Sequence, residues 1–218
     1  MTLLELSNIS YIVKDKSIIR NVSLSVNQGD YITIVGPSGS GKSTLLKLCS
    51  DLISPTSGTI TYNGRPLTAI DPESYRREVG YCFQRPYLFA KTVHRNILFP
   101  YDIRGLEPDM SRIEYLFDLL HMPLNYMERR NDELSGGEMQ RICLIRSLIF
   151  EPKVLLLDEV TSALDATNTS IVENVIDELY KKGITIISIT HNEEQSLRTA
   201  NRRITIVDGQ LAKEEVLI

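Results

Sequence analysis

The chain has 218 residues, of which 42% are hydrophobic and 24% are charged, and its formal net charge is −4. This length and composition are typical of one globular domain that buries a hydrophobic core, with room for a subdomain. The acidic balance argues against nucleic acid as the main partner, because phosphate backbones attract basic surfaces.

The first third of the chain carries strand patterns and one helix. Apolar and polar residues alternate over residues 3–13 and 18–26, which predicts half-buried antiparallel strands. Residues 31–36, YITIVG, predict a buried strand that runs into glycine, and a helix is expected from Lys42 to about Leu52. Residues 59–64 predict another strand that ends in a turn.

The middle of the chain follows a helical pattern from about residue 86 to residue 150. Residues 111–122 place apolar side chains at spacings of three and four, which is the pattern of an amphipathic helix. The residues after Gly137 repeat that spacing. We therefore predict a helical subdomain in this stretch.

The last third alternates strand and helix. VLLLD, residues 154–158, and ITIISIT, residues 184–190, are apolar without alternation, as in parallel strands that are covered on both faces. A helix is expected over residues 168–183, and a terminal hairpin is expected around Asp208 and Gly209. This order predicts an α/β fold with a helical insertion.

GPSGSGKS, residues 36–43, matches the P-loop pattern G-x-x-x-x-G-K-[ST] between a predicted strand and a predicted helix. Its glycines let backbone N–H groups point at phosphates, and the helix N-terminus adds about half a positive charge. In this motif Lys42 reaches the β- and γ-phosphates, and the Ser43 hydroxyl binds Mg²⁺. The residues expected to bind a nucleoside triphosphate here are Gly36, Pro37, Ser38, Gly39, Ser40, Gly41, Lys42, Ser43 and Thr44.

Two carboxylates follow the predicted strand VLLLD, at the strand end where ligands bind in open α/β sheets. Asp158 suits Mg²⁺, directly or through water, and Glu159 is placed to polarise an attacking water. An acidic pair in this position can also cap a helix, but the P-loop in the same chain favours hydrolysis of the γ-phosphoryl group. Small-molecule kinases and GTPases share the P-loop, so this motif alone leaves the class open.

A second glycine motif, LSGGEMQR at residues 134–141, resembles the signature motif of ATP-binding cassette (ABC) ATPases. Other markers of that family follow in order. Gln84 in YCFQRPYLF resembles the Q-loop glutamine, and SALD at residues 162–165 resembles the D-loop. His191 resembles the switch histidine, and Tyr11 the aromatic residue that stacks on adenine. The resemblance covers essentially the whole chain.

The resemblance implies one ABC ATP-binding domain over residues 1–218, with a P-loop NTPase fold. Its RecA-like core, with an N-terminal antiparallel β subdomain, would span about residues 1–85 and 151–218, and the α-helical subdomain about residues 86–150. The implied activity is ATP hydrolysis with Mg²⁺. The implied catalytic residues are Lys42, Gln84, Glu159 and His191, and the implied Mg²⁺ ligands are Ser43, Gln84 and Asp158.

The same resemblance explains why one domain carries two glycine motifs. In this family two domains pack head to tail, and the signature of one contacts the ATP on the P-loop of the other. Ser135, Gly136 and Gly137 would then bind ATP in trans, and Asp165 would lie at the dimer interface. The implied partner is a second copy or a similar chain, in a clamp that ATP closes.

A separate membrane permease is the second implied partner. In transporters of this family a short helix of the membrane chain docks beside the Q-loop, where this chain has Gln84, Arg85, Pro86, Leu88 and Phe89. The chain also resembles the FetA group of iron-export ATP-binding subunits, although it has Val160 where the family has proline. The alternatives are an exporter of a drug, lipid or peptide, and a soluble ABC ATPase that acts on nucleic acid or ribosomes.

Location is predicted from what the sequence lacks. The three cysteines form no CxxC pair, which is typical of buried, reduced thiols in the cytosol. The first residues show no signal-peptide pattern, and no run of about 18 apolar residues occurs to cross a bilayer. We expect a cytoplasmic protein that is peripheral on the cytoplasmic face of the membrane.

Overall fold

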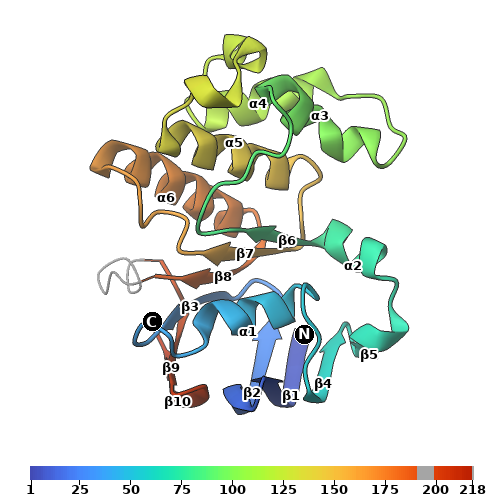
Figure 1. Cartoon of the computed structure of the whole chain (residues 1–218), viewed down its shortest axis with the longest axis vertical. Coiled ribbons are helices and arrows are strands. Elements are labelled where there is room, and N and C mark those ends of the chain that lie inside the picture. Colours follow the sequence, from blue (N-terminus) through green and yellow to red (C-terminus); the bar gives the residue numbers. More distant parts are fainter. Residues whose placement is uncertain (191–198, 218) are drawn as a thin grey trace.

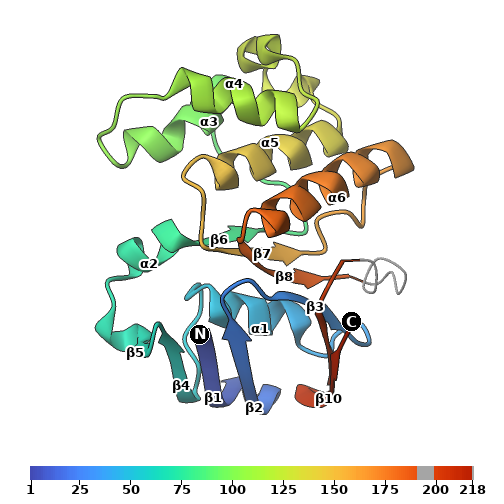
Figure 2. The same cartoon turned by 180° about the vertical axis from the view of Figure 1, so that it is seen from behind.

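The computed structural model describes residues 1–190 and 199–217, which form two β-sheets and a set of helices. Helix α1 (Lys42–Cys49) lies between the two sheets. Helices α5 (Gly136–Leu148) and α6 (Ala166–Lys181) cover the other face of the larger sheet (Figures 1 and 2). The molecule therefore has sheet, helix, sheet and helices in successive layers.

The smaller sheet is antiparallel and has the strand order β2-β1-β4-β5. Its strands are β1 (Thr2–Val13), β2 (Lys16–Asn27), β4 (Ser57–Tyr62) and β5 (Arg65–Pro66). In β2 the side chains of Val22, Leu24 and Val26 are buried, and the residues between them are exposed. The alternation in the sequence is thus the alternation between the core face and the solvent face of this sheet.

The larger sheet has the order β10-β9-β3-β8-β7-β6, and its pairs from β9 to β6 are parallel. Its strands are β3 (Tyr31–Val35), β6 (Val79–Cys82), β7 (Val154–Asp158), β8 (Thr185–Ile189), β9 (Arg202–Val207) and β10 (Gln210–Val216). The β9–β10 hairpin turns at Asp208 and Gly209, both in the left-handed region, as the sequence predicts.

Strand β7 is buried along its whole length because both of its faces are covered. Val154 and Leu156 belong to the core around α1 and the smaller sheet. Leu155 and Leu157 belong to the core formed with the helices on the other side. An unbroken apolar run is the expected sequence of a strand in this position.

The helices between β6 and β7 lie at the far end of the molecule from the smaller sheet (Figures 1 and 2). They are α3 (Val93–Asp102), α4 (Met110–Leu119) and α5, with short 3₁₀ turns at Leu124–Glu128 and Asn131–Glu133. Helix α4 buries Ile113, Leu116 and Phe117, the apolar face that its spacing predicts. Within the two described ranges, none of the helices has the length and hydrophobicity needed to span a bilayer.

Some element boundaries differ from the predictions. Helix α1 ends at Cys49 rather than near Leu52, since Asp51 adopts a left-handed conformation that α-helix excludes. Helix α6 begins earlier than expected because the Asp165 side chain accepts from the backbone N–H of Asn168 and caps it. Helix α2 (Pro72–Glu78) and the 3₁₀ turn Leu67–Ala69 were not predicted from the sequence.

Candidate nucleotide-binding site

The P-loop connects β3 to α1 and is shaped by glycines that no other residue can replace. A Cβ on Gly36 would lie 2.0 Å from the Ile206 carbonyl oxygen, and one on Gly41 would lie 2.9 Å from the Ile18 oxygen. Both glycines also have positive φ angles, of 143° and 105°. The loop is therefore held between β9 and β2, while Pro37, Ser38 and Gly39 are exposed to solvent.

The Lys42 side chain lies inside this loop and is only 5% exposed. Its ammonium group donates to the carbonyl oxygens of Gly36 and Pro37, at 2.8 and 3.0 Å. Burial lowers the pKa of Lys42, and the nearby carboxylates of Glu159 and Asp158 act in the opposite direction. The P-loop thus holds a positively charged side chain inside it, and this charge would attract an anion such as a phosphate.

Two further features of the loop fit a phosphate group. The first N–H groups of α1 have no acceptor within the helix, and its N-cap, Gly41, has no side chain to accept from them. The Ser40 hydroxyl is buried without a hydrogen-bond partner among the described residues. Unpaired donors in a buried position carry a free-energy cost that an anionic ligand would remove.

Asp158, the last residue of β7, is 4% exposed and receives a hydroxyl hydrogen bond on each carboxylate oxygen. Ser43 donates to Oδ1 at 2.8 Å, and Tyr81 donates to Oδ2 at 2.7 Å. Burial and the Asp158 carboxylate both raise the pKa of Tyr81, so its hydroxyl stays protonated. Tyr81 was not among the predicted site residues, because only the pairing of β6 with β7 brings its hydroxyl to Asp158.

Hard oxygen ligands such as Ser43 and Asp158 are the kind that Mg²⁺ prefers. Among the described residues, no group of three or more His, Cys, Asp or Glu side chains could hold a metal ion by itself. Mg²⁺ commonly takes one or two protein oxygens and completes its shell with substrate phosphates and water. The pair therefore fits an ion that binds together with a nucleotide.

Glu159 follows directly and adopts a left-handed backbone conformation, with φ of 49°. The Gln84 side-chain amide donates to its Oε2 atom at 2.6 Å. The next residue, Val160, is buried in the core with the helices. The structure thus brings Lys42, Asp158, Glu159 and Gln84 together, as the sequence predicts.

The second glycine motif opens helix α5. Ser135 caps the helix, since its hydroxyl accepts from the Glu138 N–H and its own N–H donates to the Glu138 carboxylate. Ser135 and Gly136 are exposed, and apart from the chain neighbours and the backbone of its own helix, no described atom lies within 4 Å of a Cβ built on Gly136. This edge of the helix is open to a ligand or a partner.

Asp165 lies beside that edge. A Cβ on Gly137 would lie 3.1 Å from the Asn168 side-chain nitrogen, and this nitrogen donates to Asp165 at 2.8 Å. Ser135, Gly136 and Asp165 are therefore exposed side by side with the half-buried Gly137, at the N-terminal ends of α5 and α6.

Tyr11 and His191 are two further residues that the sequence predicts for this site. Tyr11 is half-buried against the core around α1 and pairs across the sheet with Ile19, whose side chain packs against Gly41 of the P-loop. It therefore lies near the rim of the loop. His191 lies outside the described residues.

An aromatic groove of about 420 Å³ opens where β6 meets α3. Tyr81 and Phe83 form one side of it, and Tyr87 and Phe89 are among its exposed aromatic residues. Of the residues expected beside the Q-loop, Phe89 lines this groove, whereas Leu88 packs against the helical core. Its cationic residues are Arg76, Arg77, Arg104 and Arg146.

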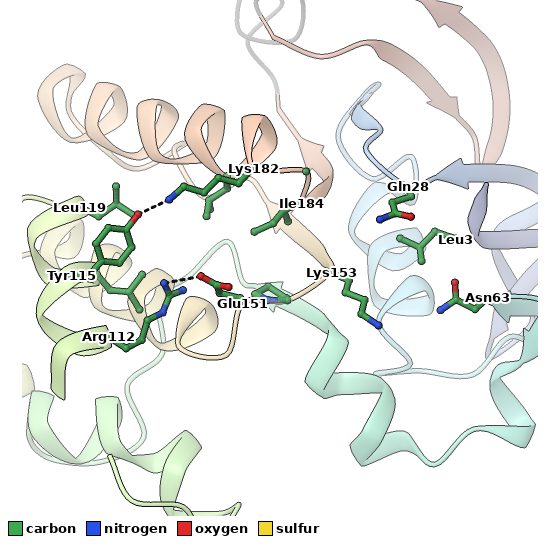
Figure 3. Close-up of a pocket in the computed structure, with 14 residues that line it drawn as sticks. Leu3, Gln28, Asn63, Arg112, Tyr115, Leu119, Glu151, Lys153, Lys182 and Ile184 are labelled. Atoms are coloured by element: carbon green, nitrogen blue, oxygen red, sulfur yellow. Dashed lines mark hydrogen bonds and ion pairs between the residues drawn. The ribbon is translucent and has the colours of Figure 1, made fainter. Parts of the chain in front are cut away.

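A second cavity, of about 360 Å³, lies between α4 and the start of β7 (Figure 3). Its cationic side chains already have partners in the chain. Arg112 pairs with Glu151 at 2.9 Å, and Lys182 donates to the Tyr115 hydroxyl at 2.6 Å (Figure 3). Lys153 pairs with Glu78 at 3.0 Å. We interpret this cavity as a junction between elements rather than an anion site.

Comparison with known proteins gives consistent relatives. Residues 19–162 match the family model described as ABC transporter. The chain is 43% identical, over 94% of its length and 91% of the relative, to the probable iron export ATP-binding protein FetA of Escherichia coli (strain K12). It is 39% identical, over 93% of its length and 85% of the relative, to the lipoprotein-releasing system ATP-binding protein LolD 1 of Chlorobium chlorochromatii (strain CaD3).

A solved structure shares the whole fold. It is described as the dimeric structure of a post-hydrolysis state of the ATP-binding cassette MJ0796 bound to ADP and Pi. Its TM-score is 0.89 at 26% identity, and 99% of each chain is covered.

Proposed function

The chain belongs to the ABC transporter family and is an ATP-binding cassette ATPase, and from this premise we propose that it is the ATP-hydrolysing subunit of a transporter whose membrane-spanning part is a separate chain. The observation that carries this proposal is the single cluster in which Ser43 meets Asp158 and Gln84 meets Glu159 beside Lys42. Charge, metal-binding oxygens and a base are all needed there for hydrolysis of ATP.

In this proposal the P-loop, residues 36–44, wraps around the phosphates, and Tyr11 stacks on the adenine. The Lys42 ammonium exchanges its two carbonyl partners for phosphate oxygens. Ser43, Asp158 and Gln84 would hold Mg²⁺. When bound, the ion supplies positive charge that stabilises the charge developing on the phosphoryl oxygens.

Glu159 acts as the base. Its carboxylate accepts a proton from water as the water oxygen forms a bond to the γ-phosphorus and the bond from that phosphorus to the bridging oxygen breaks. The products are ADP and inorganic phosphate. Gln84 orients the Glu159 carboxylate through its 2.6 Å hydrogen bond. His191 contacts the γ-phosphate in this scheme, by the family resemblance of its motif.

The protein works as a head-to-tail dimer around two ATP molecules, formed with a second copy or a similar chain. The helix end formed by Ser135, Gly136 and Gly137 contacts the ATP held by the partner, and Asp165 lies at the interface. Support comes from the openness of this helix end and from the dimeric relative MJ0796. Hydrolysis removes contacts shared by both halves, so the dimer loosens.

The membrane chain docks in the aromatic groove of Tyr81, Phe83, Tyr87 and Phe89. Exposed apolar residues gathered in one groove favour a partner helix over water. The protein would then be bound at the cytoplasmic face of the membrane. Nucleic acid is not a partner in this proposal, in keeping with the net charge of −4.

The cargo is proposed to be iron, exported from the cell. Support comes from the 43% identity to a relative named as a probable iron export ATP-binding protein. The relative at 39% identity is named for lipoprotein release, so export of a lipid-linked or other cargo is the alternative. Selection of the cargo belongs to the membrane chain in either case.

The test uses tagged Glu159→Gln protein expressed in its native cells. The protein is purified from detergent-solubilised membranes with ATP present, and the proteins that copurify are identified. Copurification of a membrane protein with several spanning segments would support the proposal. This protein should no longer copurify when ATP is omitted or when the groove is mutated. Ribosomal or DNA-associated proteins without a membrane chain would contradict it. Iron accumulation in cells that lack the subunit then tests the cargo.

A further inference from the structure

Tyr81 touches the candidate metal site at one end of its side chain. Its hydroxyl donates to Asp158 Oδ2 at 2.7 Å, opposite the bond from Ser43 to Oδ1. Asp158 is 4% exposed, and a buried carboxylate depends on such donors for its position. Ser43 is itself a proposed metal ligand, and among the described residues Tyr81 is the other side chain whose hydroxyl donates to Asp158.

The ring of the same residue faces the aromatic groove. Tyr81 lies in β6, and Phe83 is the first residue after that strand. Their ring centroids are 4.7 Å apart in an edge-on contact, and both residues line the groove. Phe83 is 46% exposed there, so a partner side chain in the groove would contact it directly.

We propose that Tyr81 is a positioning residue that connects the aromatic groove to the Mg²⁺ site, through its ring contact with Phe83 and its hydroxyl bond to Asp158. This inference rests on the proposed roles of Asp158 as a metal ligand and of the groove as a docking surface. Occupation of the groove changes the packing of Phe83 and Tyr81, and the hydroxyl carries that change to Asp158.

The backbone around Tyr81 favours such a connection. Strand β6 pairs with β7 in register, with Tyr81 beside Leu156 and Cys82 beside Leu157. The strand ladder fixes the Tyr81 backbone relative to Asp158, and the side chain has two rotatable bonds between the backbone and the ring hydroxyl. A hydrogen bond to a metal ligand typically changes metal affinity by about 10–100-fold when it is lost.

The test compares Tyr81→Phe with the wild-type chain. Binding of the non-hydrolysable analogue adenylyl imidodiphosphate is measured by calorimetry while MgCl₂ is titrated, and again in EDTA. We expect Tyr81→Phe to raise the Mg²⁺ concentration for half-maximal binding by about tenfold. Binding of the analogue in EDTA should change less than about twofold, since no phosphate contact is removed.

Tyr62→Phe is the matched control. Tyr62 also donates to a carboxylate, that of Glu78, at 2.7 Å, but Glu78 is not one of the proposed Mg²⁺ ligands. It should leave the Mg²⁺ dependence unchanged, and thermal unfolding of both variants separates lost stability from lost positioning. Unchanged Mg²⁺ dependence in a folded Tyr81→Phe protein would overturn the proposal.

Phe83→Leu tests the groove side of the connection. This substitution removes the ring contact and leaves Asp158 and the Tyr81 hydroxyl in place. We expect it to raise the Mg²⁺ concentration for half-maximal binding by a few-fold, as Tyr81→Phe does. Wild-type behaviour of this variant would overturn the link to the groove. If the wild-type chain itself showed no Mg²⁺-dependent binding, the proposed function would fail instead, so the two failures are distinguishable.

Discussion

At the scale of the residue, Glu159 combines an unfavourable backbone conformation with the proposed role of base. A left-handed conformation outside glycine costs about 1–3 kcal/mol and persists only where the surroundings enforce it. The buried Val160 side chain that follows and the hydrogen bond from Gln84 provide that enforcement. The backbone conformation and this hydrogen bond together fix where the carboxylate lies.

Glu159→Gln should keep nucleotide binding and lower the rate of hydrolysis by about 10²–10⁴-fold, because the amide cannot accept the proton. Phosphate release and analogue affinity, measured on the same preparation, check both parts. Glu178→Gln, on the exposed face of α6, serves as the control and should hydrolyse ATP as the wild-type chain does. Rapid turnover by the Glu159 variant would remove this residue from the role of base.

Lys42→Ala should weaken ATP binding by about 10–100-fold, since charged hydrogen bonds to phosphate are lost. Lys47→Ala, on the same helix, is the control. Affinities by calorimetry, together with circular dichroism to confirm folding, provide the measurement. Equal affinities for the two variants would mean that the buried ammonium does not contact the nucleotide.

The sequence predicts those parts of the site that are formed by residues close together in the chain. It does not predict contacts between residues that are far apart in the chain. The P-loop and the acidic pair depend on neighbours in the chain, so their spacing suffices. Tyr81 meets Asp158 across 77 positions, and only the pairing of β6 with β7 brings them together. The residues around Glu159 in the sequence do not indicate that its backbone is left-handed.

At the scale of the element, Ser135 has two tasks. It caps α5 through the reciprocal bonds with Glu138, and it lies on the exposed edge that we assign to the partner. Capping alone is worth about 1 kcal/mol. Substitutions there therefore need a readout that separates the stability of the helix from the contact with the partner.

Ser135→Arg should leave ATP binding to the P-loop intact and prevent the ATP-dependent dimer, because a bulky side chain blocks the open edge beside Gly136. Light scattering in the Glu159→Gln background, with and without ATP, measures the dimer. Ser111→Arg places the same charge on the exposed first turn of α4 and should still dimerise. A dimer that survives Ser135→Arg would contradict the assignment of this edge.

At this scale, the sequence predicts an element well when the element is long and its apolar residues recur with a clear period. Helix α4 was predictable because its apolar spacing matches a helix that buries one face. Strand β6 was not, since it has four residues, includes a glycine and depends on its neighbour β7. Helix ends were displaced where a single residue, Asp51 or Asp165, stops or caps the helix.

At the scale of the whole molecule, the order of strands and helices in the sequence predicts the layered α/β fold. The similarity to ABC cassettes over 99% of the chain confirms the fold class. Three features carried the prediction: alternating residues in the smaller sheet, unbroken apolar runs in the larger one, and helical spacing between them. Strand order within each sheet is set by packing between distant segments and could not be derived from these patterns.

The two faces of β7 belong to two different cores, with Val154 and Leu156 on one side and Leu155 and Leu157 on the other. Loss of either core would expose half of this strand to water. Leu155→Ala and Leu156→Ala should each lower the free energy of unfolding by about 2–5 kcal/mol. Far-ultraviolet circular dichroism and tyrosine fluorescence should show the same lowered midpoint in each variant.

Two separate midpoints in one variant would mean that the cores melt independently. Because β7 belongs to both cores, the chain should unfold as one cooperative unit in spite of its several layers. Partial unfolding of the helical layer would then be rare under native conditions, and proteolytic cleavage there should track the stability of the entire molecule. A strand of five residues thus sets the size of the cooperative unit.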